Sequence, residues 1–382
     1  MYVAHLSLLD FRSYPSLEVD FDPGVVALVG PNGQGKTNAV EAIGYLAALT
    51  SHRVGSNAPL IRMGADRAGI GVTARHGERT IKVALEIGSG RPAPPSVNGV
   101  KQTRHRDAAG IVRSVVFGPD DLSLVKGDPG FRRRFMDLLL VQRNPRWAGE
   151  LGDYERVAKQ RASLLKSLGS LRRAGRQAED STMEVWDDRL AGLGARIGVA
   201  RSELVEQLTP HFTAAYQDIA GAGPAPGLKY VASGEPEGEG DSDAAKRRTV
   251  EEEKARLLDV IVGVKDREIE RGVNLVGPHR DELEIRLGPM PAKGYASHGE
   301  SWSLALALRL AAFEILTDGS GGTPVLILDD VFAELDAARR DALVKMVRRA
   351  EQTVITAAVP ADLPSALAPA IYRVQGGTVS RD

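Results

Sequence analysis

The chain has 382 residues, of which 43% are hydrophobic and 26% charged, and its formal net charge is −1. This length allows two or three domains with at least one sizeable core, and the near-zero charge excludes a basic field over the whole molecule. The absence of cysteine excludes disulfides, thiolate zinc sites and cysteine catalysis, and it fits a reducing cytosol.

The N-terminus and the apolar segments indicate no membrane partner. Residues 1–14 already contain Asp10 and Arg12, and they lack the basic region and the cleavage site of a signal peptide. No apolar run approaches the length of a membrane span. We therefore expect a cytoplasmic protein.

The first third of the chain predicts strands around one helix. Residues 1–30 hold three alternating or β-branched segments separated by turn residues, which is typical of strands. Residues 37–49 follow a helical pattern, and residues 70–118 alternate strand-like segments with turns. From about residue 120 onward, the spacing of the apolar residues is that of helices.

A long helical pattern with three internal glycines occupies the middle of the chain. Over 184–208, apolar residues recur every three or four positions. Gly192, Gly194 and Gly198 weaken a helix there, because glycine costs about 1 kcal/mol relative to alanine. We expect a helical hairpin packed on itself instead of a long coiled coil.

The last third returns to an α/β pattern. Residues 221–246 are rich in Gly, Pro and acidic residues, which predicts loops that are partly disordered. Residues 249–270 form a charged helical pattern. The segments 324–330 and 353–359 are typical of buried core strands.

A phosphate-binding loop follows the apolar strand pattern at 25–29. The segment fits G-x-x-x-x-G-K-[ST] at every position, and its residues are Gly30, Pro31, Asn32, Gly33, Gln34, Gly35, Lys36 and Thr37. Backbone N–H groups and the helix N-terminus would hold the phosphates of ATP. Lys36 would reach the β- and γ-phosphates, and the Thr37 hydroxyl would bind Mg²⁺. The alternative is a glycine-rich turn without a ligand.

An acidic strand end supplies the second half of a nucleotide site. The strand pattern at 325–330 ends in Asp329 and Asp330. Asp329 would hold Mg²⁺, and Asp330 would orient or deprotonate the attacking water. The alternative is an ordinary strand that enters a polar turn. Lys36 and Asp329 lie far apart in the sequence, so a large segment must be inserted into one nucleotide-binding fold.

A Ser-x-Gly turn precedes the apolar helical pattern that begins near residue 301. This turn resembles the Ser-x-Gly motif of P-loop ATPases of the ABC class. In those proteins the motif caps the γ-phosphate of the nucleotide that is bound to a second subunit. Ser297 and Gly299 occupy that place, and Asp336 lies where such proteins keep a loop that contacts the partner subunit. A serine hydroxyl and a helix dipole suit an anion. The alternative for Ser297 is a helix N-cap.

Six segments in order along the chain resemble the RecF family of bacterial recombination-repair proteins, relatives of Rad50 and SMC heads. The segments are LDFRSY (9–14), GPNGQGKTN (30–38), VVFGPDDLSLVKGDPGFRRRFMD (115–137), GPHRDEL (277–283), SHGE with LALALRLA (297–311) and LILDDVFAELD (326–336). The resemblance implies an ATP-dependent DNA-binding protein with a weak, DNA-stimulated ATPase. It also implies a head-to-head homodimer, which would work with RecO and RecR to load RecA.

The resemblance implies further nucleotide-binding residues, and this chain differs from the family's usual sequence at some of the positions concerned. It implies nucleotide contacts by Arg12 and Asn38, which fall in two of the matching segments. The family's turn usually has glutamine where this chain has His298 and Glu300. A carboxylate near a phosphate is unfavourable unless it points away, toward the helix N-terminus. The usual switch histidine is replaced by Thr356, which we include as a nucleotide contact.

Two basic stretches are candidates for DNA contacts. Residues 131–176 hold twelve Lys or Arg and four Asp or Glu, and residues 100–106 form a second stretch. Such a patch favours salt-dependent contacts to the duplex backbone, at duplex, gapped or junction DNA. The alternative is a solvated or structural role, in which the triplet would pair with Asp137 or the nucleotide lobe. The candidates are Arg132, Arg133, Arg134, Arg172, Arg173, Lys101 and Arg104.

We therefore expect an α/β fold, an ABC-type P-loop ATPase head with an inserted, mostly helical arm. Residues 1–119 and 271–382 would form the head, and residues 120–270 the arm. The GPHRDEL stretch could lie near the composite site or brace the two lobes. The alternative function is the ATPase subunit of a membrane ABC transporter, and DNA stimulation of the ATPase would discriminate. A small-molecule P-loop kinase is a third possibility.

Overall fold

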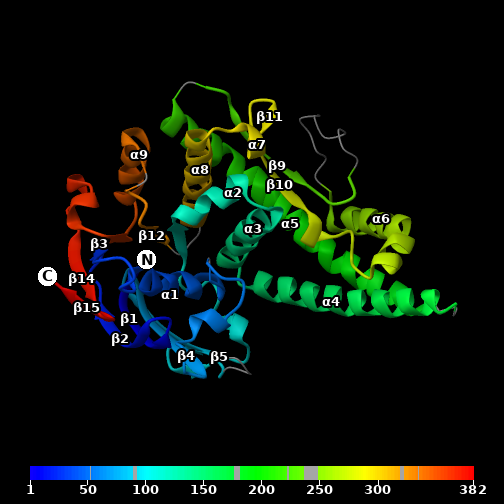
Figure 1. The fold of residues 1–382 in the computed structure, drawn as a ribbon, viewed down its shortest axis with the longest axis horizontal. Coiled ribbons are helices and arrows are strands. Elements are labelled where there is room, and N and C mark those ends of the chain that lie inside the picture. Colours follow the sequence, from blue (N-terminus) through cyan, green and yellow to red (C-terminus); the bar gives the residue numbers. More distant parts are fainter. Residues whose placement is uncertain are drawn as a thin grey trace.

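A rounded head and a protruding helical arm make up the molecule. The computed structural model describes residues 1–51, 53–88, 93–175, 181–221, 223–235, 248–318, 322–333 and 335–382. Both termini lie in the head, and the long helices α4 and α5 extend away from it (Figure 1). Over these residues the strands form two six-stranded sheets and one three-stranded sheet.

The central sheet of the head is mostly parallel, and its strands β3, β8, β12 and β13 are largely buried. Its strand order is β15-β14-β3-β13-β12-β8, and β3, β13, β12 and β8 run parallel. Near-continuous apolar runs explain this arrangement, because a parallel sheet is covered on both faces. The strands are β3 (Gly24–Val29), β8 (Ser114–Phe117), β12 (Val325–Asp329), β13 (Gln352–Ala357), β14 (Ala370–Gln375) and β15 (Thr378–Arg381).

A second, antiparallel sheet lies on the other side of helix α1 (Lys36–Ala48). Buried residues of α1 join one apolar core with strands of both sheets, so the helix that follows the phosphate loop is held between them. The strand order is β2-β1-β4-β5-β6-β7. The strands are β1 (Tyr2–Phe11), β2 (Tyr14–Asp20), β4 (Arg67–His76), β5 (Arg79–Gly88), β6 (Ser96–Val97) and β7 (Val100–Lys101). The strands predicted in this region are confirmed.

The arm consists of helices that pack on a small sheet and against the head. The described helices of this region are α2 (Leu122–Lys126), α3 (Pro129–Arg143), α4 (Arg146–Arg173), α5 (Ser181–Ala220) and α6 (Val250–Arg271). The predicted charged helix is confirmed as α6. In the part of the chain that the structure describes, no helix is both long enough and apolar enough to cross a membrane.

The predicted break in the glycine-containing helix is wrong, because α5 runs without interruption from Ser181 to Ala220. Its glycines allow close packing instead. A Cβ on Gly194 would lie 3.1 Å from Pro278, and one on Gly198 would lie 3.6 Å from the Tyr230 hydroxyl. Packing against α4 and α6 outweighs the low helix propensity of glycine. The hairpin that exists is formed by α4 and α5.

Part of the segment predicted as loops is a strand. β9 (Pro226–Val231) pairs antiparallel with β10 (Glu282–Leu287), and β11 (Met290–Pro291) completes this sheet. The pairing partner is some fifty residues away in the sequence, so local composition gives no sign of it. The rest of the predicted acidic loop, residues 236–246, lies outside the described residues.

One apolar core joins the head to the base of the arm. It includes residues of β8, β12 and α3 together with residues of α5 and α8 (His298–Thr317). Trp302, Leu304 and Leu308 of α8 are buried in it, because α8 is apolar on nearly every side. The short α7 (Ala292–Tyr295) precedes α8, and α9 (Ala337–Val347) follows β12.

Two glycines in the arm helices should respond to alanine in opposite directions. A Cβ on Gly169 would lie 2.5 Å from the carbonyl oxygen of Ile269, whereas one on Gly192 would meet nothing closer than 3.8 Å. We expect Gly169→Ala to lower the free energy of unfolding by about 1–3 kcal/mol. Gly192→Ala should raise it by about 0.5–1 kcal/mol. Urea unfolding of both variants checks this, and equal effects would contradict the α4–α6 contact.

Candidate nucleotide site

The phosphate loop closes around the ammonium group of Lys36. Lys36 is buried, and its Nζ donates to the carbonyl oxygens of Gly30 and Pro31 at 2.6 and 3.2 Å and to Asn32 Oδ1 at 3.3 Å. The loop connects the end of β3 to the start of α1, as the motif predicts. The positive charge therefore lies at the centre of the loop and at a helix N-terminus.

Two glycines are required by close approaches to neighbouring elements. Gly35 has a φ of 105°, and a Cβ there would lie 2.8 Å from the Tyr14 hydroxyl, which donates to the Gly35 carbonyl at 3.0 Å. A Cβ on Gly30 would lie 2.2 Å from the carbonyl oxygen of Val374 on β14. The Gln34 side chain accepts from the Gly376 N–H at 2.8 Å. The loop is thus supported from both sides before any ligand binds.

Asp329 meets the phosphate loop at the end of β12. Thr37 Oγ1 donates to Asp329 Oδ1 at 2.9 Å, and Thr356 Oγ1 donates to the same oxygen at 2.7 Å. The Asp330 N–H donates to Thr356 Oγ1 at 2.9 Å, and Asp330 has a left-handed φ of 52°. From the end of the neighbouring strand β13, Thr356 therefore holds the carboxylate of Asp329 and the backbone N–H of Asp330.

The Thr37 hydroxyl and the Asp329 carboxylate fit a Mg²⁺ ion. Both are hard oxygen donors and already lie within hydrogen-bond distance of each other. Burial raises the pKa of Asp329, although hydrogen bonds from Thr356 and Thr37 oppose this shift. Within the described residues, no group of three His, Asp or Glu side chains could hold a metal without other ligands. Phosphate oxygens or water would have to complete the coordination.

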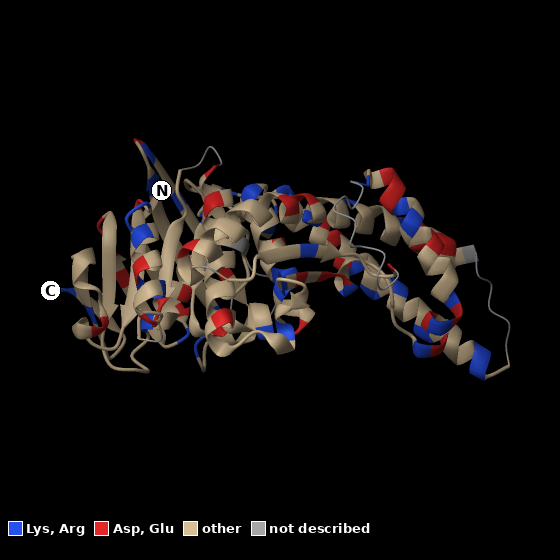
Figure 2. Cartoon of the chain, turned by 90° about the horizontal axis from the view of Figure 1, so that it is seen from above, with Lys and Arg blue, Asp and Glu red and all other residues tan. Residues whose placement is uncertain are grey.

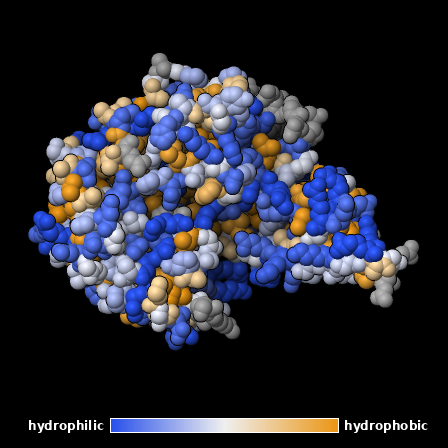
Figure 3. Space-filling view, in the orientation of Figure 1, coloured by the Kyte–Doolittle hydropathy of each residue, from blue (hydrophilic) through white to orange (hydrophobic). Residues whose placement is uncertain are grey.

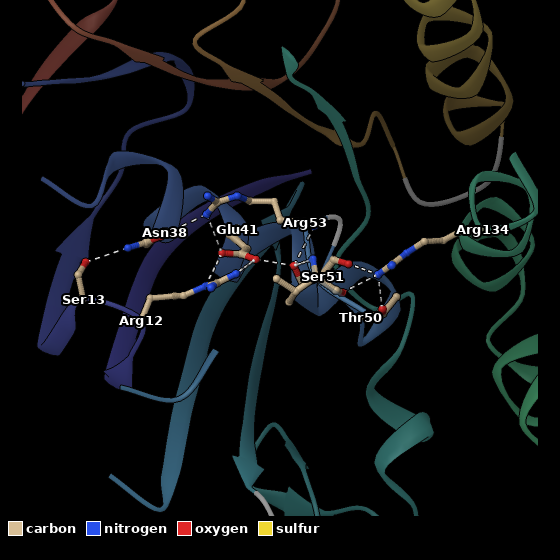
Figure 4. A network of polar contacts seen from close by, with 9 residues as sticks. Arg12, Ser13, Asn38, Glu41, Thr50, Ser51, Arg53 and Arg134 are labelled. Atoms are coloured by element: carbon tan, nitrogen blue, oxygen red, sulfur yellow. Dashed lines mark hydrogen bonds and ion pairs between the residues drawn. The ribbon is translucent and has the colours of Figure 1, made fainter. Parts of the chain in front are cut away.

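A buried carboxylate with two arginines stands behind the phosphate loop (Figure 4). Glu41 of α1 is fully buried, and Arg12 binds it through two hydrogen bonds of 2.9 and 2.7 Å. Ser51 donates to Glu41 as well, and Arg53 Nη1 lies 3.3 Å from Glu41 Oε2 and from Asn38 Oδ1. Arg12 is therefore anchored on α1, where it stabilises the helix that carries Lys36 and Thr37.

Residues 50–54 were not singled out from the sequence, yet they join the arm to this carboxylate. Arg134 of α3 donates to Thr50 Oγ1 at 2.6 Å and to the Ser51 carbonyl (Figure 4). The pKa of Glu41 is lowered mainly by the hydrogen bonds from Arg12 and Ser51, and the charge of the neighbouring Arg53 adds to this shift. Sequence reasoning missed Arg53 as a member of this network, and its position shortly after α1 was a weak signal.

Ser297 is the N-cap of α8. Its Oγ accepts from the Glu300 N–H at 3.2 Å, and the Glu300 carboxylate accepts from the Ser297 N–H at 2.8 Å. This reciprocal pair is a capping box. The expectation that Glu300 points toward the helix N-terminus is confirmed. Hydrogen bonds from Ser297 lower the pKa of Glu300, so its negative charge is held at the end of α8.

Arg339 links the two elements that the resemblance assigns to a subunit contact. Asp336 caps α9 by accepting from the Arg339 N–H at 3.0 Å, and it pairs with Arg339 Nη1 at 2.5 Å. The same guanidinium donates to the Gly299 carbonyl at 2.7 Å. Asp336 and the Ser-x-Gly turn therefore lie on one face. Among the described contacts, no hydrogen bond joins Ser297 or Gly299 to residues 30–38 of the same chain.

The arginine triplet of α3 serves as a brace, which favours the structural alternative. Arg132 is only 4% exposed, and it binds Glu282 through two hydrogen bonds of 2.6 Å. Arg133 donates to the Asp281 carbonyl at 2.8 Å. Asp137 pairs with Arg201 instead of with the triplet. Because Arg132 is buried, we do not retain it as a DNA contact. Arg133 and Arg134 are partly buried and donate to neighbouring backbone and hydroxyl oxygens, so we do not propose them as DNA contacts either.

The other candidates for DNA contacts remain on the surface. Lys101, Arg104 and Arg173 are exposed, and Arg172 pairs with Asp266 of α6 at 2.9 Å. Figure 2 shows that basic and acidic residues alternate along the arm. Acidic groups of α5 and α6 therefore offset part of the positive charge that 131–176 has in the sequence. Arg176 lies outside the described residues.

The GPHRDEL stretch is a brace between α4, α5 and β9. The Tyr154 hydroxyl lies 2.6 Å from His279 Nδ1, and burial lowers the pKa of His279 to about 4, so this imidazole is neutral at pH 7. The Pro278 carbonyl accepts from Arg201 at 2.7 Å. The Asp281 carboxylate accepts from the Tyr230 hydroxyl of β9 and from the Ser233 N–H at 2.7 Å. These contacts favour the lobe-to-lobe role over a place in the nucleotide site.

Known proteins are similar to this chain over nearly its whole length. A family model described as the RecF/RecN/SMC N terminal domain matches residues 2–374. A protein of Streptomyces avermitilis named DNA replication and repair protein RecF is 52% identical over 382 residues, which cover all of both chains.

Solved structures share the fold. The structure named recombination mediator protein RecF-ATP in the RecFOR pathway has a TM-score of 0.88 at 24% identity, over 100% of this chain and 97% of that one. An Smc head domain with an extended coiled coil from Pyrococcus furiosus has a TM-score of 0.51 at 18% identity, over 100% and 96% of the chains. These matches confirm the ABC-type head that the sequence predicts.

The contacts of Glu41 predict how the free energy of unfolding depends on pH. Burial opposes ionisation of Glu41, but hydrogen bonds from Arg12 and Ser51 and the charges of Arg12 and Arg53 lower its pKa below the ordinary value of 4.5. Its contribution to stability is therefore complete above that value and is lost as pH falls through the lower folded pKa. Glu41→Gln should cost about 3 kcal/mol at pH 7, because buried positive charge is left behind.

Urea unfolding between pH 3 and pH 7 checks this. The Glu41→Gln chain should lose less stability on acidification than the wild type. The exposed Glu78 provides the matched control, and Glu78→Gln should change stability by no more than about 0.5 kcal/mol. Parallel pH curves for wild type and Glu41→Gln would contradict the assigned ionisation.

Proposed function

This chain belongs to the RecF family of DNA replication and repair proteins, within the RecF/RecN/SMC ATPases, and we propose that it is an ATP-controlled DNA-binding protein. The observation that carries the proposal is the contact of Thr37 with Asp329, which joins the phosphate loop to the acidic strand end. ATP would lie on residues 30–38, with Mg²⁺ at Thr37 and Asp329. The bound ion would neutralise charge on the phosphates.

Within this site, we assign the catalytic roles to three residues. The Lys36 ammonium would exchange its carbonyl acceptors for phosphate oxygens. Asp330 would orient the attacking water or accept its proton, because its backbone is held by Thr356 and its carboxylate is only half-buried. Arg12 and Asn38 would act mainly by holding α1. Slow hydrolysis, stimulated by DNA, suits a switch on assembly.

A second copy of the chain would complete the site. The Ser297 hydroxyl accepts the Glu300 N–H, but its own proton remains available as a donor. The helix-cap role and a γ-phosphate contact are therefore compatible. The Gly299 N–H and the positive end of α8 would face the same anion. Asp336, tied to Gly299 through Arg339, would lie in the same dimer interface.

The head, residues 1–119 and 271–382, would form this dimer, and the arm, residues 120–270, would add a surface for DNA. Lys101, Arg104, Arg172 and Arg173 are the exposed contacts that we propose for the duplex or gapped DNA backbone. RecO and RecR would be the protein partners, with loading of RecA as the outcome. This assignment rests on the family and on the RecFOR pathway named for the similar structure.

Ser297 variants separate the phosphate contact from the helix cap. Ser297→Arg should bind ATP normally but lose the ATP-driven dimer in light scattering. Ser297→Asp keeps an N-cap acceptor, so its stability should stay within about 0.5 kcal/mol of wild type. It should nevertheless fail to dimerise, because a carboxylate repels the γ-phosphate.

Two further variants test the rest of this site in the same assay. Lys36→Ala should lose ATP binding, and Asp330→Asn should hold a long-lived dimer because hydrolysis is blocked. A Ser297→Arg chain that dimerises normally with ATP would exclude the composite site. Loss of ATP binding in Ser297→Arg would instead indicate a damaged fold.

Charge reversal on the arm tests the DNA surface. Arg172→Glu combined with Arg173→Glu should weaken duplex binding at least roughly tenfold and reduce the salt slope by about 2, since two phosphate contacts are lost. Arg381 is the matched control because it is also an exposed arginine in an ion pair, with Asp22. Titration of labelled duplex at several salt concentrations measures both values, and an effect equal to that of Arg381→Glu would refute the surface.

A further inference from the structure

A large cavity lies at the junction of head and arm, away from the phosphate loop. Its volume is about 690 Å³, and it is lined by the end of α1, by the turn at His105, and by α3, α4 and α5. Figure 3 shows the surface indented where the head meets the arm. None of residues 30–37 lines this cavity. It therefore belongs to neither the proposed nucleotide site nor the exposed DNA surface.

The walls of this junction cavity are mainly apolar. They include Leu49, Leu138, Val141, Leu151 and Ile197. Sites for small molecules are typically apolar concavities of about 300–1,000 Å³ that contain a few convergent polar groups. Both the size and the lining thus suit a ligand of roughly mononucleotide size, with a flat or apolar body.

The polar groups of the junction cavity are dominated by guanidinium groups. Arg133 and Arg134 both line it, and they donate hydrogen bonds to neutral acceptors, the Asp281 carbonyl and Thr50 Oγ1. Among the described residues, no carboxylate forms an ion pair with either side chain. The Nε of Arg134 is buried without a hydrogen-bond partner. Two positive charges are therefore partly removed from water, and the nearby carboxylates of Asp281, Glu282 and Asp137 form no ion pair with Arg133.

The other charged side chains of the cavity do not neutralise the positive charges of Arg133 and Arg134. Arg201 is neutralised by Asp137 through two hydrogen bonds of 2.8 Å. Arg106 lies 3.9 Å from Asp153, and Glu155 is exposed. Burial lowers the pKa of both Arg133 and Arg134, which agrees with positive charge held where water is scarce.

We propose that the junction cavity binds a phosphorylated ligand of mononucleotide size. Guanidinium groups pair with phosphate oxygens through strong, charge-assisted hydrogen bonds, and the apolar walls would hold the body of the ligand. A polynucleotide fits less well. The adjoining hollow, which shares Arg106, is also lined by Asp107, Glu150 and Asp153, and these carboxylates would repel a strand that continues outward.

Isothermal titration of the full chain with AMP tests this assignment, with inorganic phosphate as the comparison ligand. AMP should bind more tightly than phosphate, and it should bind Lys36→Ala as well as wild type, because the phosphate loop is not involved. Arg133→Leu should weaken AMP binding roughly tenfold or more, since a charge-assisted contact is lost. The matched control is Arg143→Leu, an exposed arginine of the same helix that does not line the cavity.

A second variant keeps the test decisive if Arg133→Leu fails to fold. Gly152 of α4 lines the cavity, and a Cβ there would meet nothing within 4 Å, so Gly152→Phe fills the space without a backbone clash. It should abolish AMP binding while ATP binding at the phosphate loop persists. The proposal is overturned if AMP does not bind at millimolar concentration, if phosphate binds as tightly, or if Gly152→Phe binds AMP like wild type. If the wild-type chain binds AMP but not ATP, only the proposed nucleotide site is refuted.

Discussion

The contact between Thr37 and Asp329 is the constraint on which the rest of the molecule depends. Two residues separated by 292 positions meet at 2.9 Å, because β3, β13 and β12 lie side by side in one parallel sheet. Every element between them has to leave and re-enter the head without disturbing that sheet. The arm is therefore an insertion whose two connections must both be anchored close to the nucleotide site.

Arginine side chains provide much of that anchoring. Arg132 ties α3 to β10, Arg134 ties α3 to the segment after α1, and Arg201 ties α5 to α3 and to Pro278. A guanidinium group suits this role because its five donors satisfy several carbonyl or carboxylate oxygens at once. The same property makes arginine a phosphate ligand, so residue type alone does not separate braces from binding groups.

This ambiguity sets the limit of what the sequence predicts. The strand and helix that flank the loop at 30–37 and the strand that ends at Asp329 were predicted correctly, since each depends on a local motif or on the spacing of apolar residues. The continuous α5, the strand β9 and the buried Arg132 were not, because each depends on a partner distant in sequence. Arg53 was missed for the same reason, since only the folded chain brings it beside Glu41.

The Ser297 turn shows that a structural and a functional explanation need not compete. The capping box uses the oxygen of the hydroxyl as an acceptor and the Glu300 carboxylate to receive the Ser297 N–H, while the hydroxyl proton stays free. Glutamate in place of glutamine strengthens the cap but adds a negative charge where a γ-phosphate would dock. A Glu300→Gln chain should therefore dimerise at lower ATP concentration than wild type while its helix is slightly less stable. Both effects follow from the one charge.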